Sequence, residues 1–136
     1  NIGLQDAKYT KINAAAAASG FILGVTVPQR APESTIQAGF DYTQYVDDLR
    51  GDVTLAADIQ ITDDYWMSGQ NPLDSFNPGF ETVNGTLSWD HEEGDWGVML
   101  SCKNCLDETY ITTDFLDARF INDPMRWSLS LKFLFN

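Results

Sequence analysis

Residues 125–135 read MRWSLSLKFLF and decide the fold class. Every second residue is apolar: Met125, Trp127, Leu129, Leu131, Phe133 and Phe135. The residues between them are Arg126, Ser128, Ser130 and Lys132, with Leu134 as the one exception. Because successive side chains of a β-strand point to opposite faces, this alternation predicts a strand with one apolar and one polar face.

The same alternation recurs along most of the chain. It is clear over residues 36–43, 53–62, 82–89 and 96–103, and less regular over residues 2–9. Most of these segments approach the roughly 9–11 residues that a tilted strand needs to cross a bilayer. Strands of globular proteins average about 5–6 residues. We therefore predict an all-β fold, an antiparallel up-and-down meander of about six long strands.

The predicted connections between these strands alternate in length. Long connections lie near residues 11–33, 67–79 and 107–123, and short turns near residues 47–51 and 91–95. In a meander this order puts the short turns at one end and the long loops at the other, which is typical of outer-membrane barrels. The Ala14–Ala18 run predicts at most a short helical turn inside the first long loop.

Aromatic residues gather near both ends of the predicted strands. The short-turn end has Tyr42, Tyr45, Trp89, Trp96, Phe133 and Phe135, and the long-loop end has Tyr65, Trp66, Phe80, Tyr110 and Trp127. Membrane–water interfaces select such aromatic belts. We assign one belt to Tyr42, Trp89 and Trp96, and the other to Tyr65, Tyr110 and Trp127.

Composition excludes several classes of function. The chain has 136 residues, with 20 acidic against 8 basic side chains and a net charge of -12. This balance argues against nucleic-acid binding, which requires a basic surface. No apolar run reaches 18 residues, so a transmembrane helix is not predicted. Because the chain starts at Asn1 without an initiator Met, we treat residues 1–136 as one partial domain, a fragment or a processed product.

Residues 96–110, WGVMLSCKNCLDETY, resemble the penultimate strand of TonB-dependent outer-membrane receptors. That family commonly has a W-x-V-x-L-x-x-K-N-L-x-D-E-x-Y pattern there. Residues 30–34, residues 80–84 and the stretch from Asp123 to Phe135 resemble other recurring pieces of the same family. The resemblance implies that the chain is the last six strands of a 22-stranded transmembrane β-barrel filled by an N-terminal plug domain.

The end of the chain also resembles the signal that the barrel assembly machinery reads. The matching residues are Ser128, Ser130, Phe133 and Phe135, with Ser130 standing where glycine is usual. The resemblance further implies an integral protein of the bacterial outer membrane that takes up a scarce nutrient such as a ferric siderophore, cobalamin or glycan. Its implied partners are outer-membrane lipid, the plug domain, the assembly machinery, and the TonB complex through the N-terminal part absent here.

No motif of the chain supports an enzyme, a metal site or a cofactor. His91 lies in a predicted tight turn, and the chain has no other histidine. Asp63 and Asp64, beside Trp66, are interpreted either as a solvated acidic loop base or as contacts to a ligand or calcium at the outer rim. Cys102 and Cys105 lie three residues apart, about 10 Å on an extended strand. That distance exceeds the roughly 7 Å limit for a disulfide. The pair is therefore interpreted as substitutions on a barrel strand, with a bridge after local distortion as the alternative.

Twelve polar residues are predicted to share the face opposite the apolar one. They are Gln37, Asp41, Thr54, Asp58, Gln60, Thr82, Asn84, Ser101, Lys103, Arg126, Ser128 and Lys132. In a barrel this face lines the lumen, where Arg126 and Lys132 are expected to pair with acids on neighbouring strands. The alternative to a receptor is a soluble secreted or periplasmic binding module, built as a six-stranded β-sandwich or a small barrel. A small complete barrel or the end of a porin is a third option.

Overall fold

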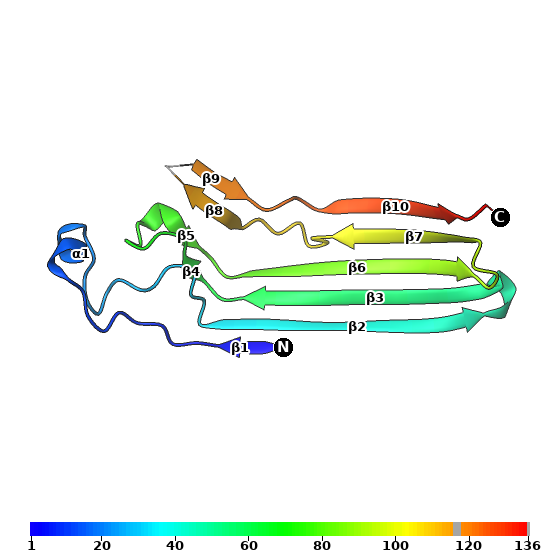
Figure 1. Cartoon of the computed structure of the whole chain (residues 1–136), viewed down its shortest axis with the longest axis horizontal. Coiled ribbons are helices and arrows are strands. Elements are labelled where there is room, and N and C mark those ends of the chain that lie inside the picture. The colour runs from blue at the N-terminus through cyan, green and yellow to red at the C-terminus, as the bar shows by residue number, and fades with distance from the viewer. Residues whose placement is uncertain (116–117, 136) are drawn as a thin grey trace. The chain divides into compact units, whose positions relative to one another are not determined.

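The computed structural model describes residues 1–115 and 118–135. Six strands form one antiparallel sheet, in the order β1-β2-β3-β6-β7-β10 (Figure 1). They are β1 (Ile2–Leu4), β2 (Ser34–Val46), β3 (Gly51–Thr62), β6 (Phe80–His91), β7 (Trp96–Lys103) and β10 (Arg126–Phe133). Spatial order follows chain order, so the prediction of an all-β antiparallel meander is confirmed.

The predicted first strand is the main error in the strand assignment. We predicted a strand over residues 2–9, but β1 ends at Leu4 after pairing with Ser34–Ile36 of β2. Beyond it, Lys8 pairs with Asp6 of its own segment instead of with a neighbouring strand. The irregular alternation of this segment gives it no continuous apolar face to hold it in a ladder.

The connections alternate in length as predicted, but the long ones contain structure of their own. Small helical elements are α1 (Ala14–Ala18) and two single turns of 3₁₀-helix, Asp47–Leu49 and Leu73–Ser75. Two further sheets each have two strands: β4 (Tyr65–Trp66) with β5 (Phe76–Asn77), and β8 (Ile111–Phe115) with β9 (Ala118–Ile121). The short helix was predicted, and the Asn13 side chain caps it by accepting a hydrogen bond from the Ala16 N–H. The two small sheets were not predicted.

The chain divides into two compact units. The first contains Asn1–Ile36, Ile61–Phe80 and Thr109–Asn122, and the second contains the rest of the described chain. The described residues include only three buried hydrophobic side chains, Met67, Phe80 and Cys102. They contain no second sheet comparable in size to the six-stranded one. A β-sandwich would need both a second sheet and a dry core between the two.

Cys102 and Cys105 form a disulfide, so the favoured interpretation of two unbridged cysteines is wrong and the alternative, a bridge after local distortion, is the one found. Their Cα atoms lie 5.7 Å apart because β7 ends at Lys103 and Asn104 adopts a left-handed conformation, with φ of 50°. The buried Asn104 side chain holds this turn. Its Nδ2 donates to the Glu108 carbonyl at 2.8 Å, and its Oδ1 accepts from the Glu108 N–H at 3.1 Å. The distance argument failed because it assumed that the strand continues.

Among the described residues, no helix is long and apolar enough to cross a membrane.

Candidate functional site: the two faces of the sheet and a loop pocket

One face of the sheet carries aligned rows of apolar side chains. The strand registers place Leu87 of β6 opposite Leu100 of β7, which lies opposite Leu129 of β10. The next row joins Trp89, Val98 and Leu131. Leu87, Leu100 and Leu129 are 48%, 39% and 66% exposed. The rows therefore form an apolar surface that the described residues leave uncovered.

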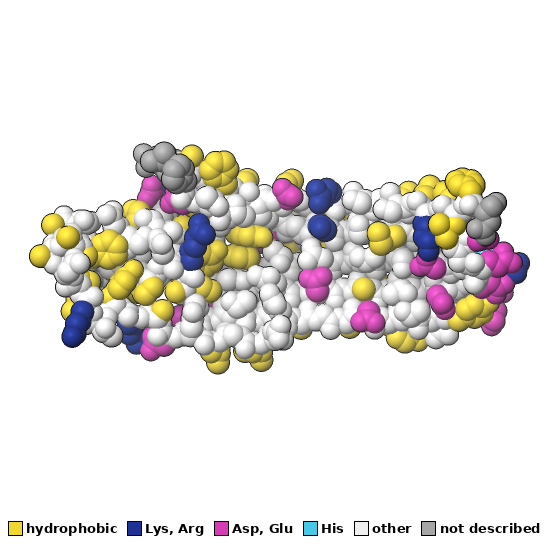
Figure 2. All heavy atoms as spheres, viewed as in Figure 1, with side chains coloured by type: hydrophobic (Ala, Val, Ile, Leu, Met, Phe, Trp, Pro, Cys, Tyr) yellow, Lys and Arg dark blue, Asp and Glu magenta, His cyan; other side chains and the backbone are white. Residues whose placement is uncertain are grey.

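The opposite face carries polar side chains, which hydrogen-bond across the strands. Gln37 of β2 donates to Gln60 of β3, and the hydroxyls of Thr43 and Thr54 lie 2.9 Å apart. Asn84 of β6 donates to Asp58 of β3 at 2.8 Å. Figure 2 shows this polar face, with acidic and basic side chains scattered over it. The predicted division into two faces is thus present in the structure.

Lys132 and Arg126 each lie near an acidic side chain, but neither acid is on the strand adjacent to β10, where we expected the partners. Lys132 Nζ lies 3.7 Å from Asp90 Oδ1, although the register places Gly97 of β7 between them. A Cβ atom on Gly97 would lie 2.8 Å from the same oxygen, so the missing side chain leaves the space that Lys132 crosses. Arg126 instead contacts Asp123 of its own connection, at 3.9 Å.

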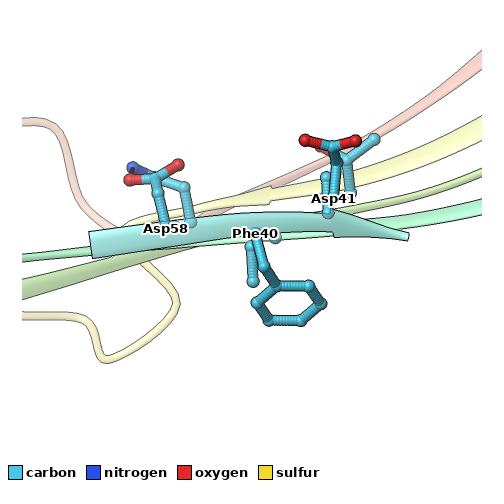
Figure 3. Close-up of a pocket in the computed structure, with 9 residues that line it drawn as sticks. Phe40, Asp41 and Asp58 are labelled. Carbon is cyan, nitrogen blue, oxygen red and sulfur yellow. Dashed lines mark hydrogen bonds between the residues drawn. The ribbon is translucent and has the colours of Figure 1, made fainter.

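A shallow hollow of about 290 Å³ lies where β2, β3 and β6 run side by side. Asp41 and Asp58 point to the same side of the strands, whereas Phe40 points to the other (Figure 3). Gly39 keeps the space open, because a Cβ there would lie 3.3 Å from Asp58 Cβ. No group of three His, Cys, Asp or Glu side chains in the described parts of the chain is placed to hold a metal.

A charged cluster joins the two short turns. Glu92 accepts hydrogen bonds from the Tyr45 hydroxyl at 2.6 Å and from Arg50 Nε at 2.9 Å. The Glu92 N–H also donates to the Arg50 carbonyl at 2.8 Å. The hydrogen bonds from Tyr45 and then Arg50 hold the pKa of the Glu92 carboxyl below its ordinary value. Acidic side chains gather at this end of the sheet (Figure 2).

The residues predicted for the short-turn belt lie on β2, β6 and β7. Trp89 and Trp96 pack edge to face with ring centroids 4.4 Å apart, and His91 stacks on Trp96 at 5.4 Å. Tyr42 is 60% exposed, and its hydroxyl donates to Gln44 Oε1. His91 thus lies against an indole ring beside the turn.

The three residues predicted for the long-loop belt each have different neighbours. Tyr110 stacks on the buried Phe80 with ring centroids 3.9 Å apart. Tyr65 pairs with Asn77 in the β4–β5 hairpin. Trp127 belongs to the other unit. It lies on β10 opposite Cys102 of β7, and its side chain is 59% exposed.

The structure brings two of the three predicted rim residues to one pocket. Asp64 and Trp66 line a pocket of about 230 Å³ in the first unit. Asp63 does not line it; its N–H donates to the Ser34 carbonyl, and its Oδ1 accepts from the Asp64 N–H. The sequence analysis missed the other charged lining residues, Asp6, Lys8 and Glu33. Asp6 and Lys8 were assigned to the strand predicted over residues 2–9, whereas β1 ends at Leu4.

The residues of the predicted assembly signal lie on and beyond the edge strand β10. Ser128, Ser130 and Phe133 lie opposite Ser101, Met99 and Trp96 of β7. Phe135 follows the end of β10 and is 96% exposed. The other edge of β10 has no neighbour in the sheet formed by the described residues.

Comparisons with known proteins show a structural likeness but no sequence match. No protein-family profile matches the chain, and no curated protein sequence matches it. The structure is similar to the crystal structure of BauA, the ferric preacinetobactin receptor from Acinetobacter baumannii. The TM-score is 0.64 with 16% sequence identity over 79% of this chain. The match spans 16% of the receptor, and at this identity the likeness concerns the fold alone.

Proposed function

We propose that this chain is part of the barrel wall of a TonB-dependent outer-membrane receptor. The observation that carries the proposal is the exposed apolar face of the sheet, backed by a hydrogen-bonded polar face. Rows such as Leu87, Leu100 and Leu129 lie open to the surroundings, where a soluble domain would cover them. Lipid covers such a face in a transmembrane barrel, while water and the lumen solvate the other.

Two further features support this proposal. The strand order is a plain meander whose short turns and long connections alternate. The fold is also similar to a segment of a ferric siderophore receptor, at 16% sequence identity. In the proposed assembly, the six strands form the C-terminal part of a 22-stranded barrel. Closure of that barrel gives the edge strands β1 and β10 their missing neighbours.

In this proposal the chain is not an enzyme. It contributes wall, three outer connections and the C-terminal assembly strand to a receptor that takes up a scarce nutrient, such as a ferric siderophore, cobalamin or glycan. Its partners are outer-membrane lipid, a plug domain inside the barrel, and the assembly machinery that reads Ser128, Ser130, Phe133 and Phe135. The TonB complex acts through the N-terminal part of the receptor.

The first test concerns the coding sequence upstream of Asn1 in the source genome. A plug domain and an energy-coupling segment encoded there support the proposal. An open reading frame that encodes neither of them contradicts it.

A second test examines lipid insertion directly. The chain is diluted from urea into phospholipid vesicles, which are then sedimented and washed with alkaline carbonate. We expect the chain to stay with the vesicles and to show β-structure by circular dichroism. A folded monomer that remains in the supernatant without detergent would overturn the proposal.

A further inference from the structure

We propose that the pocket beside β4 binds a small organic cation that carries an apolar body. The pocket has a volume of about 230 Å³ and lies within the first compact unit. Its lining residues come from residues 6–8, 27–33 and 64–66. The proposal holds whether or not the sheet belongs to a barrel, because it uses only residues of this unit.

Backbone hydrogen bonds hold the three lining segments together. The Arg30 N–H donates to the Trp66 carbonyl at 2.7 Å, which ties residues 27–33 to β4. The Gln5 N–H donates to the Glu33 carbonyl at 3.0 Å, which ties residues 6–8 to the same stretch. Trp66 also packs against Phe76 of the paired strand β5, with ring centroids 5.0 Å apart. A pocket fixed in this way loses little entropy when a ligand binds.

The charged lining residues favour a cation. Three carboxylates, Asp6, Glu33 and Asp64, lie around the pocket with one ammonium group, that of Lys8. Lys8 Nζ lies 2.8 Å from Asp6 Oδ2, so these two charges largely cancel. Glu33 and Asp64 then leave the pocket with a negative potential, which attracts cations and repels anions.

The remaining lining residues suit an apolar body next to the positive charge. Tyr65 and Trp66 are half-buried aromatic side chains, and aromatic faces attract organic cations. Ala7, Pro28 and Ala31 are half-buried as well, whereas the four charged side chains are exposed. Since pockets for drug-sized ligands measure roughly 300–1,000 Å³, this one suits a compact molecule. The 2-phenylethylammonium ion is a probe of suitable size and charge.

The test is isothermal titration calorimetry of the full chain in detergent micelles at low ionic strength. The probes are 2-phenylethylammonium, the neutral 2-phenylethanol and the anionic phenylacetate. We expect saturable binding at one site for the ammonium probe, and weaker or undetectable binding for the other two. The absence of saturable binding of the cation overturns the proposal, and so does equal binding of phenylacetate.

Two neighbouring aspartates provide a matched pair of variants. We expect Asp64→Asn to raise the dissociation constant of the ammonium probe about three- to five-fold, because one attractive charge is lost. Asp63→Asn should change it less than about two-fold, since Asp63 does not line the pocket. Trp66→Leu should weaken binding about two- to five-fold through loss of the cation–π contact. Should Asp64→Asn not fold, Glu33→Gln takes its place. Equal affinities of both aspartate variants contradict this assignment of the site.

Discussion

Gly51 illustrates how single positions fix the sheet. It is buried at the start of β3, where an added Cβ atom would collide with the Asp90 carbonyl oxygen and lie 2.6 Å from Trp89 Nε1. Both neighbours belong to β6, so the glycine lets the backbones of β3 and β6 approach each other. A larger residue would force the two strands apart at their turn end.

We therefore expect Gly51→Ala to lower the free energy of unfolding by about 1–3 kcal/mol, the usual cost of overpacking. The measurement is the urea midpoint of the chain in detergent micelles. Gly85→Ala is the control, because its Cβ would meet nothing nearer than the Ala56 carbonyl oxygen at 4.0 Å. A loss of stability in Gly85→Ala as large as that in Gly51→Ala would contradict the close-approach argument.

Asn77 holds the first residue of β8 with its side-chain amide. Its Nδ2 donates to the Ile111 carbonyl at 3.0 Å and its Oδ1 accepts from the Ile111 N–H at 3.1 Å, and the residue is fully buried. We expect Asn77→Ala to cost about 1–3 kcal/mol, because two backbone groups lose their partners.

Hydrogen exchange checks this prediction at single residues. The Ile111 amide should exchange faster in Asn77→Ala. The neighbouring Tyr110 amide donates to Asn122 Oδ1 and should keep its rate. Unchanged protection of Ile111 would show that Asn77 does not hold the segment.

At the scale of elements, the Tyr45–Glu92–Arg50 cluster joins the turn before β3 to the turn after β6. The pKa of the Glu92 carboxyl is held below its ordinary value of 4.5, first by the hydrogen bond from Tyr45 and then by that from Arg50. A carboxyl with a lowered pKa in the folded state stabilises that state above the ordinary pKa. This contribution is lost as the pH falls through the lowered value.

We therefore expect Glu92→Gln to have a lower melting temperature than the unmodified chain at pH 7. The two melting temperatures should converge as the pH falls well below 4.5, where Glu92 becomes protonated. Glu93→Gln serves as the control, since the Glu93 side chain has no hydrogen bond with Tyr45 or Arg50 in the described structure. If the difference in melting temperature between Glu92→Gln and the unmodified chain stays constant with pH, the charge of Glu92 does not stabilise the folded state.

Most strands could be predicted from sequence because each has a regular apolar face. The prediction for β7 was right at both ends, and β2 runs only three residues past its predicted end. The β4–β5 and β8–β9 sheets are too short for alternation to identify them. Their strands depend on contacts distant in sequence, such as that of Asn77 with Ile111.

The candidate pocket was only half predictable for the same reason. Asp64 and Trp66 could be recognised from the sequence as an acidic and an aromatic residue at a strand end. Glu33 and Lys8 line the same pocket because backbone hydrogen bonds join segments that are distant in sequence. No local sequence pattern predicts those hydrogen bonds. The Cys102–Cys105 bridge depends on the left-handed Asn104, a conformation that sequence alone did not indicate.

At the scale of the whole molecule, the two faces of the sheet define two environments. Leu129 lies in the apolar rows, and its neighbour Ser128 lies on the other face, opposite Ser101. If lipid covers the apolar face, a charge there is costly while a charge on the polar face is tolerated.

We expect Leu129→Lys to reduce folding into phospholipid vesicles, at a cost of about 2–4 kcal/mol if the site lies near the bilayer midplane. Ser128→Lys should fold nearly as well as the unmodified chain. Both are measured as the fraction of chain with β-structure and protease resistance in vesicles. Equal effects of the two substitutions would contradict a lipid-facing side.

Glu92 also bears on the order in which the molecule assembles. The β2–β3 and β6–β7 hairpins are each closed by a short turn and can form from nearby residues. Their mutual alignment places Glu92 against Arg50, 42 positions earlier, and can occur only after the whole connection between β3 and β6 has been synthesised. Closing such a loop is slower than closing a hairpin. Alignment of the two preformed hairpins is therefore the expected slow step of folding, and changes at Glu92 should act on that step.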